Sequence, residues 1–317
     1  MTLDSGTQQP TGCLASVAIL MCTYNGAKYL RAQLDSFGEQ THKNWRLFVS
    51  DDGSSDETIK ILDEYRRRWG SERIEVRRGP SQGFCQNFLS LATDLGIEAD
   101  FYAFSDQDDV WLPKKLEAAL AVISSNSATS FLYCGRTSYV KDDLQPYAKS
   151  PLFAFPGTFR NALVQSIAGG NTMVFNRSAK KLLEAAGRLN PVSHDWWLYQ
   201  LVSGSGGRIY YDSNSYVLYR QHSQALVGGN NTLWNKFERV GMVMQGRFKN
   251  WTDQNLQALV AAKSLLTYES WQILELFVQL RHSSIKERFR MLEVCGLYRQ
   301  TWRGTMSLVL AALINKL

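Results

Sequence analysis

The chain has 317 residues, enough to bury one large core or a domain with an appendage. Hydrophobic residues make up 44% of it and charged residues 20%, a globular composition that excludes a disordered or repetitive protein. The net charge of +6 suits phosphorylated small molecules or an anionic membrane surface. No nucleic-acid-binding motif accompanies this charge, so we expect no nucleic-acid partner.

The cysteines and the N-terminus indicate the compartment. The five cysteines are scattered without a CxxC pair, which argues against a disulfide framework or a zinc site. Residues 1–14 form a polar N-terminal tail rather than a signal peptide, and no apolar run reaches the roughly 18 residues that span a bilayer. We therefore expect a cytoplasmic protein, either soluble or peripheral at the inner face of the plasma membrane.

Short apolar runs alternate with helical patterns in the first part of the chain. The runs predict buried strands over residues 16–22, 47–50, 73–77 and 101–105. Helices are predicted from the spacing of Tyr29, Leu30, Leu34 and Phe37, and over residues 57–69 and 84–95. A further helix is predicted to start with Pro113 just inside its first turn. This alternation predicts an α/β fold with a parallel sheet and a ligand crevice at the carboxyl ends of its strands.

The remainder of the chain is less regular, and its pattern changes once more. Residues 131–219 contain a glycine loop at 168–171, an apolar stretch at 172–175, a helix from residue 178, and strands over 209–211 and 216–219. From residue 231 the pattern is helical and basic. We therefore predict a catalytic domain over 15–229 and a helical C-terminal subdomain over 230–317.

An acidic cluster directly follows the strand predicted at 101–105. Asp106, Asp108 and Asp109 lie within four residues, and three carboxylates so close repel one another unless a cation neutralises them. Mg²⁺ takes carboxylate oxygens and is usually shared with the phosphates of a substrate. The alternative is a polar turn before the next helix, in which Asp109 acts as the helix cap.

Three further clusters carry possible chemistry, each with a structural alternative. Asp51 after the second strand can accept hydrogen bonds from a base or ribose, or belong to an Asp-rich turn. Asp195, flanked by His194 and two tryptophans, suits a general base beside a sugar, or a helix start with buried aromatics. Arg220 can clamp a phosphate and His222 can bind metal, or both can be structural.

The order and spacing of these strings resemble family-two glycosyltransferases with the GT-A fold. MCTYNGAKYL with SDDGSSDET is similar to the opening of that family, FSDQDDVWLPKKL to its DXD region, and residues 168–175 to its acceptor-side glycine loop. The motifs SDQDDVW, HDWW and YRQH are similar to those of bacterial rhamnosyltransferases of cell-wall and O-antigen assembly. The resemblance covers residues 16–229.

The resemblance implies a nucleotide-diphospho-sugar transferase with a Rossmann-like, mostly parallel sheet, and an inverting reaction. It implies donor contacts at Cys22, Thr23, Tyr24, Asn25, Asp51, Asp52, Asp106, Gln107 and Arg220. It implies Mg²⁺ or Mn²⁺ on Asp108 and His222, and Asp195 as the catalytic base. Acceptor contacts are implied at Gly169, Gly170, Asn171, Asp109, His194, Trp196 and Trp197.

The same resemblance suggests the substrates. The donor it favours is dTDP-L-rhamnose, with a UDP-hexose donor or a non-catalytic nucleotide-sugar-binding module as alternatives, and the acceptor is a glycan carried on a lipid. A dehydrogenase or nucleotidyltransferase is disfavoured because TYNGAKYL lacks the glycine-rich phosphate loop. YRQH replaces the QxxRW string of processive synthases and no membrane span is present, which favours transfer of one or a few sugars.

The C-terminal segment allows two interpretations. Basic residues there are interleaved with aromatic ones, a combination that can lie on an anionic membrane. The alternative is a solvated face on helices that pack against the catalytic domain or form a homodimer.

Overall fold

The structure is a computed structural model that describes residues 14–123, 129–221, 247–314 and 316–317. The strands are β1 Val17–Thr23, β2 Trp45–Asp51, β3 Ile74–Arg78, β4 Phe101–Ser105, β5 Val110–Trp111, β6 Phe131–Val140, β7 Pro146–Lys149, β8 Val174–Asn176 and β9 Arg208–Arg220. The helices are α1 Ala27–Gly38, α2 Thr58–Trp69, α3 Phe84–Ala92, α4 Lys115–Ile123, α5 Phe159–Ala162, α6 Arg177–Ala186, α7 His194–Gly204, α9 Arg247–Ala261, α10 Tyr268–His282, α11 Ile285–Cys295 and α12 Trp302–Leu313. Two 3₁₀ turns are η2 Gly170–Thr172 and η3 Lys263–Leu265.

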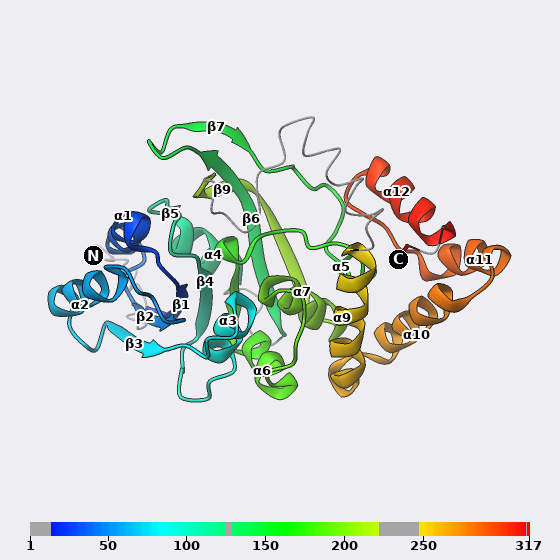
Figure 1. The fold of residues 1–317 in the computed structure, drawn as a ribbon, viewed down its shortest axis with the longest axis horizontal. Helices are drawn as coiled ribbons and strands as arrows, with labels where there is room; N and C mark the ends of the chain where they lie inside the picture. Colours follow the sequence, from blue (N-terminus) through cyan, green and yellow to red (C-terminus); the bar gives the residue numbers. More distant parts are fainter. Residues whose placement is uncertain (1–13, 124–128, 222–246, 315) are drawn as a thin grey trace, which may run out of the picture.

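One sheet runs through the molecule, and its first half is parallel as predicted. The strand order is β3-β2-β1-β4-β8-β6-β9-β5, with β7 paired to β6 (Figure 1). Every residue of β1 is buried, and successive side chains enter two separate cores, with Ile19 on one face and Leu20 on the other. Burial on both faces explains why this strand is a continuous apolar run in the sequence.

The second half of the sheet differs from the prediction. Residues 131–140, expected to be irregular, form the long strand β6, and the strands expected at 209–211 and 216–219 are one strand, β9. Shifts of register near Gly135 and Arg136 let β6 and β9 stay paired across the polar stretch that interrupts the apolar pattern of β9. Strand β8 runs antiparallel between β4 and β6, and Pro113 precedes α4 instead of lying inside it.

The C-terminal helices share a core with the sheet. Leu259 of α9, Phe277 of α10 and Leu308 of α12 belong to the same apolar cluster as Leu20 of β1. The domain boundary predicted at Gly228-Gly229 lies outside the described residues, so that division stays a prediction. Within the described residues, no helix is both long and apolar enough to cross a bilayer.

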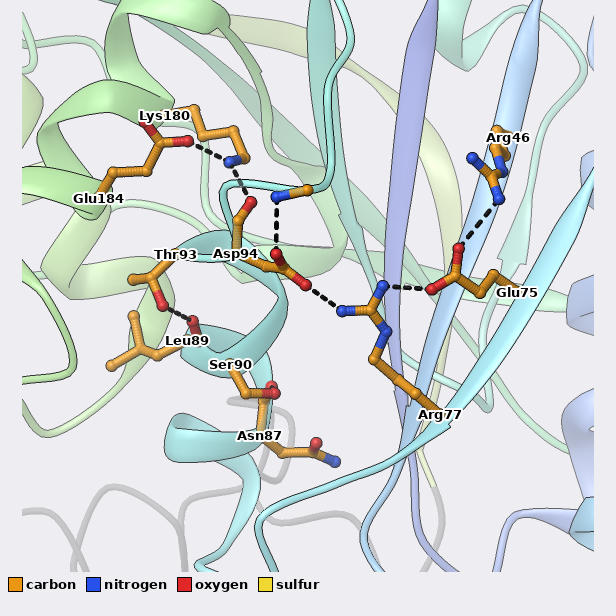
Figure 2. A network of polar contacts seen from close by, with 11 residues as sticks. Arg46, Glu75, Arg77, Asn87, Leu89, Ser90, Thr93, Asp94, Lys180 and Glu184 are labelled. Atoms are coloured by element: carbon orange, nitrogen blue, oxygen red, sulfur yellow. Dashed lines mark hydrogen bonds and ion pairs between the residues drawn. The ribbon is translucent and has the colours of Figure 1, made fainter.

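A polar network ties β3 to α3 and α6 (Figure 2). The Arg77 guanidinium of β3 is paired with Glu75 and with Asp94, which follows α3. The buried Lys180 of α6 donates to the backbone oxygen of Asp94 over 2.8 Å and is also paired with Glu184. The network therefore fixes α6, which packs against α7.

Candidate active site

The predicted polar clusters meet at the carboxyl edge of the parallel strands. Thr23 at the end of β1 is the register partner of Asp51 at the end of β2, and Met21 is the partner of Ser105 at the end of β4. The segments that follow these strands, residues 24–26, 52–57 and 106–109, therefore leave the sheet from one edge. This is the crevice position expected for an α/β sheet.

The Asp51 carboxylate organises the loop after β2. Its Oδ1 accepts hydrogen bonds from the backbone of Gly53 over 3.1 Å and Ser54 over 2.8 Å, and its Oδ2 accepts from the hydroxyls of Thr23 over 2.7 Å and Ser54 over 2.6 Å. Four bonds fill the acceptor capacity of a carboxylate. The direct hydrogen bond to a base that the sequence suggested is not available in this arrangement, and Asp51 shapes the loop instead.

Asp52 connects that loop to the one after β3. Its two oxygens accept from the backbone of Ser81 over 2.7 Å and of Gly83 over 3.2 Å. A Cβ on Gly79 would lie 2.6 Å from Asp52 Oδ1 and 2.7 Å from Asn87 Oδ1, so only glycine fits there. The loops after β2 and β3 are thus fixed relative to each other.

The loop after β1 presents an aromatic ring. Gln107 holds the backbone of Tyr24 from both sides, since its Oε1 accepts from Tyr24 N over 2.9 Å and its Nε2 donates to Tyr24 O over 3.0 Å. Asn25, with φ of 48°, accepts from the Ser55 backbone over 2.8 Å. The Tyr24 side chain is 58% exposed, so a fixed backbone carries a free ring that can pack against a base.

Cys22 lies beside these loops but is buried. Burial, and then the nearby Asp106 carboxylate, raise the pKa of its thiol well above the ordinary value. Its predicted contact with the donor is thus limited to that of a neutral, apolar group.

The acidic cluster concentrates negative charge. Desolvation, followed by the charges of Asp108 and Asp195, raises the pKa of Asp106 to about 8. A bound cation would remove that penalty, and carboxylate oxygens are ligands that Mg²⁺ and Mn²⁺ accept. No three His, Cys, Asp or Glu side chains form a metal cluster within the described ranges, and His222 lies outside them. One or two carboxylates plus substrate phosphates are the usual Mg²⁺ site, so the residues present fit such an ion.

Asp109 joins distant segments instead of facing solvent, which corrects its predicted role as an acceptor contact. It is fully buried, and its two oxygens accept from the Asn171 side chain and, over 3.3 Å, from the Arg220 backbone. Burial raises the pKa of this carboxyl well above its usual range, with Asp108 and Asp106 adding to the rise. Asn171 is also buried. Through its bonds to Asn171 and to the Arg220 backbone, Asp109 links the acidic cluster to η2 and to the end of β9.

The Arg220 side chain turns away from its predicted phosphate role. Its Nη1 donates to the Asp142 backbone oxygen over 2.9 Å, and its guanidinium lies 4.8 Å from the centre of the Tyr29 ring. The side chain is buried, and these contacts join it to α1 and to the turn after β6. Arg220 thus supports the loop structure in this arrangement.

Asp195 lies in the first turn of α7 and is held by two backbone donors. Its Oδ2 accepts from Gly170 over 3.1 Å and its Oδ1 from Trp196 over 2.7 Å. The helix N-terminus favours negative charge at this position. Its charge acts on Asp106 and on Cys85, so α7 brings this carboxylate to the acidic cluster.

His194 faces the core, which corrects its predicted acceptor role. It stacks on Phe88 with ring centres 3.8 Å apart, and it packs edge-on against Phe104 at 4.7 Å. Both ring nitrogens are buried without a hydrogen-bond partner, and burial lowers the pKa of the imidazole to about 4. A Cβ on Gly170 would lie 2.5 Å from its Nε2, so the glycine permits this close contact.

The two tryptophans are also core residues. Trp196 is buried and donates from Nε1 to the Ala162 backbone oxygen over 2.6 Å, and Trp197 is fully buried. Neither indole can present a face to an acceptor sugar, because α7 is enclosed on nearly all sides. Among the predicted acceptor contacts, Gly169 is exposed, whereas Gly170 is buried and donates its N–H to Asp195.

Sequence reasoning missed two residues that the structure places at the site. Ser54 binds Asp51 and the Asn25 backbone, and its signal was present in the DDGS string. Phe84 begins α3, is largely exposed and contacts the His194 ring with centres 6.2 Å apart. An apolar residue at a helix start is usually a core residue, so no sequence signal separated Phe84 from the core.

The fold and the site define a nucleotide-sugar transferase of the GT-A type, and comparison with known proteins gives the family. Residues 18–183 match the model for Glycosyl transferase family 2, and the chain belongs to that family. It is 30% identical over 237 residues to the dTDP-rhamnosyl transferase RfbG of Shigella flexneri, covering 70% of this chain and 78% of the relative. It is therefore a glycosyltransferase.

Solved structures share the fold. The S. aureus TarS 1–349 structure in complex with UDP-GlcNAc aligns with a TM-score of 0.51 and 18% identity, over 80% of this chain and 82% of that one. The mannosyltransferase PcManGT from Pyrobaculum calidifontis, in complex with GDP-Man and Mn²⁺, aligns with a TM-score of 0.51 and 16% identity, over 95% and 86%. These likenesses support the predicted GT-A fold.

Proposed function

We propose that this glycosyltransferase transfers L-rhamnose from dTDP-L-rhamnose to a hydroxyl of a growing cell-surface glycan, with inversion and with Asp195 as the base. The observation that carries the mechanism is the placement of Asp195, which is held by the Gly170 backbone and lies close enough to Asp106 to raise its pKa. The donor is supported by the similarity to a protein named as a dTDP-rhamnosyl transferase.

The nucleoside end of the donor would occupy the crevice formed by the loops after β1, β2 and β3. The backbone of Tyr24 is fixed by Gln107, and its exposed ring offers a face for the pyrimidine. Asp51 and Asp52 hold the surrounding backbone rigid, so ordering of the loops is complete before the donor arrives.

Asp108 and His222 would hold a divalent cation beside the diphosphate, with Asp106 as a neighbouring donor contact. Such an ion, Mg²⁺ or Mn²⁺, offsets the charge that develops on the departing nucleoside diphosphate. Without a cation, Asp106 binds a proton at neutral pH, because its pKa is about 8.

Asp195 would accept the proton of the acceptor hydroxyl. As that O–H bond breaks, the oxygen forms a bond to the anomeric carbon, and the carbon–oxygen bond to the diphosphate breaks with its electron pair leaving on phosphate. A single displacement needs one base and no enzyme nucleophile, so the anomeric configuration inverts. The backbone hydrogen bonds from Gly170 and Trp196 hold the carboxylate in one orientation, which would suit this role.

The first experiment measures release of nucleoside diphosphate from a panel of dTDP-L-rhamnose, UDP-hexoses and GDP-mannose with Mg²⁺ or Mn²⁺. Turnover with dTDP-L-rhamnose alone would support the proposal. Turnover with a UDP-sugar would keep the class and replace the donor, an alternative favoured by the fold shared with TarS in complex with UDP-GlcNAc.

Two substitutions test the residue roles. Asp195→Asn should lower kcat by about 10²–10⁴-fold while donor affinity changes little, because general-base assistance is worth that factor. Asp108→Ala should abolish metal-dependent donor binding. The exposed Asp63→Asn of α2 is the matched control, and near-normal turnover of Asp195→Asn would exclude the base assignment.

A further inference from the structure

Helix α12 exposes an apolar stripe. Trp302, Met306 and Leu310 are spaced four residues apart and are 70%, 61% and 59% exposed. Residues at this spacing lie on one face of a helix, and the opposite face is buried through Leu308 and Ala312. The Arg303 guanidinium lies 5.3 Å from the centre of the Trp302 ring, and the three side chains stay mostly exposed. Helix α12 therefore carries apolar side chains on both its inner and its outer face.

Helix α11 also exposes apolar residues. Ile285 and Phe289, again four residues apart, are both exposed. The buried Arg288 of the same helix donates from Nη1 to the Ala312 backbone oxygen over 3.1 Å, which joins α11 to the end of α12. The two helices lie at the end of the molecule remote from α1 and α2 (Figure 1). We use the name terminal face for five of the exposed apolar residues of these helices: Ile285, Phe289, Trp302, Met306 and Leu310.

Basic side chains border the terminal face. Lys286, Arg290 and Arg303 are exposed beside its apolar residues. Residues 285–317 contain six Lys or Arg and two Glu, so this short segment carries +4 of the net charge of +6 of the whole chain. A surface that pairs exposed apolar groups with positive charge is complementary to an anionic, partly apolar partner.

We propose that the terminal face docks on an anionic phospholipid bilayer. Tryptophan, leucine and methionine side chains enter the boundary between headgroups and acyl chains, while Lys and Arg contact the phosphates. Neither helix is long enough to span a bilayer, so the contact lies in the plane of the interface. A second copy of the chain is the poorer occupant, because a two-fold contact would set this positive segment against itself.

Vesicle sedimentation tests the proposal with the full chain. The purified protein is mixed with vesicles of phosphatidylcholine alone or with an equal part of phosphatidylglycerol, at low and high salt. We expect binding to the anionic vesicles that weakens as salt rises. Arg290→Ala with Arg303→Ala should lower this affinity by about 25-fold, because each basic residue near an anionic surface contributes about 1 kcal/mol, or about 5-fold.

A second variant tests the apolar part. Trp302→Ser with Leu310→Ser should lower binding at least about tenfold, since burial of such side chains is worth more than 1 kcal/mol each. The matched control is Leu95→Ser, which removes a leucine that is 73% exposed in the turn after α3, and it should bind as the wild type does. Thermal unfolding and donor turnover check that every variant is folded, since none of these residues belongs to the proposed catalytic site.

Three results would overturn the proposal. The first is failure of the wild type to bind anionic vesicles at low salt. The second is equal binding by the Trp302/Leu310 variant and the Leu95 control. The third is a dimer, seen by sedimentation velocity without vesicles, that this variant converts to a monomer while vesicle binding is unchanged, because the terminal face would then join two copies of the chain.

Discussion

Acid should destabilise this protein through one buried imidazole. His194 is buried among Phe88 and Phe104, and its pKa of about 4 lies below the ordinary value of 6.5. Between these two values the unfolded chain binds a proton that the folded chain does not accept. The unfolded state therefore binds more protons, and the free energy of unfolding must fall as the pH falls through this window.

The size of the effect follows from the two pKa values. Their full difference corresponds to about 3 kcal/mol, of which about 2.5 kcal/mol is reached on going from pH 7.5 to pH 4.5. The substitution His194→Phe keeps an aromatic ring in the same enclosure and removes the titrating group. It also removes no hydrogen bond, because both ring nitrogens lack a partner in the structure.

Urea unfolding followed by circular dichroism at pH 7.5 and 4.5 measures the effect. Other groups also titrate, so the informative quantity is the pH-dependent loss in the wild type minus that in His194→Phe, expected to be about 2.5 kcal/mol. Any constant cost of fitting the larger ring cancels in this difference. His282→Phe, which removes an exposed histidine at the end of α10, should follow the wild type. Equal losses in His194→Phe and the wild type would refute the reasoning.

Three further substitutions probe the supports of the site. Gln107→Ala removes two hydrogen bonds to the Tyr24 backbone and should raise the donor KM about tenfold with little change in kcat. An unchanged KM in steady-state kinetics would contradict this. Asn171→Ala leaves the buried Asp109 without its side-chain partner, so chemical denaturation should show a loss of about 1–3 kcal/mol of stability. The same substitution should lower kcat more than it raises the donor KM. Lys180→Met should cost about 1–3 kcal/mol of stability, because it leaves Glu184 unpaired and removes one of the two hydrogen bonds that the Asp94 carbonyl accepts. A change in donor KM would show that the network acts on the site.

The parallel half of the fold could be predicted because each of its strands is marked by the residues of that strand alone. Strands buried on both faces are continuous apolar runs, and β1, β2 and β4 begin and end within two residues of the predicted limits. Strand β6 was missed because its second half carries Arg136 and Thr137, and β9 was divided because its polar centre is accommodated by register shifts with β6. Pairing between segments about 75 residues apart leaves no periodic trace in either one.

The residue types of the site could be predicted better than their roles. Acids at strand ends are a local signal, and Asp106, Asp108 and Asp195 do converge. The directions of His194, Trp196 and Trp197 could not be inferred, because α7 is buried on nearly every side and so has no amphipathic pattern to mark an outer face. The bond between Asp109 and Asn171 joins residues 62 positions apart, and only the folded structure reveals it.

These contacts divide the proposed site into two parts, each held by its own set of hydrogen bonds. The donor side is braced within the first half of the chain, where Gln107, Asp51 and Asp52 connect loops that leave adjacent parallel strands. The proposed base comes from α7 and is held by Gly170, which is joined to the donor side through Asn171 and Asp109. Substitutions in the first set should therefore act mainly on donor KM. Breaking the Asn171–Asp109 link should act mainly on kcat, because it releases the proposed base without disturbing the loops proposed to receive the nucleotide.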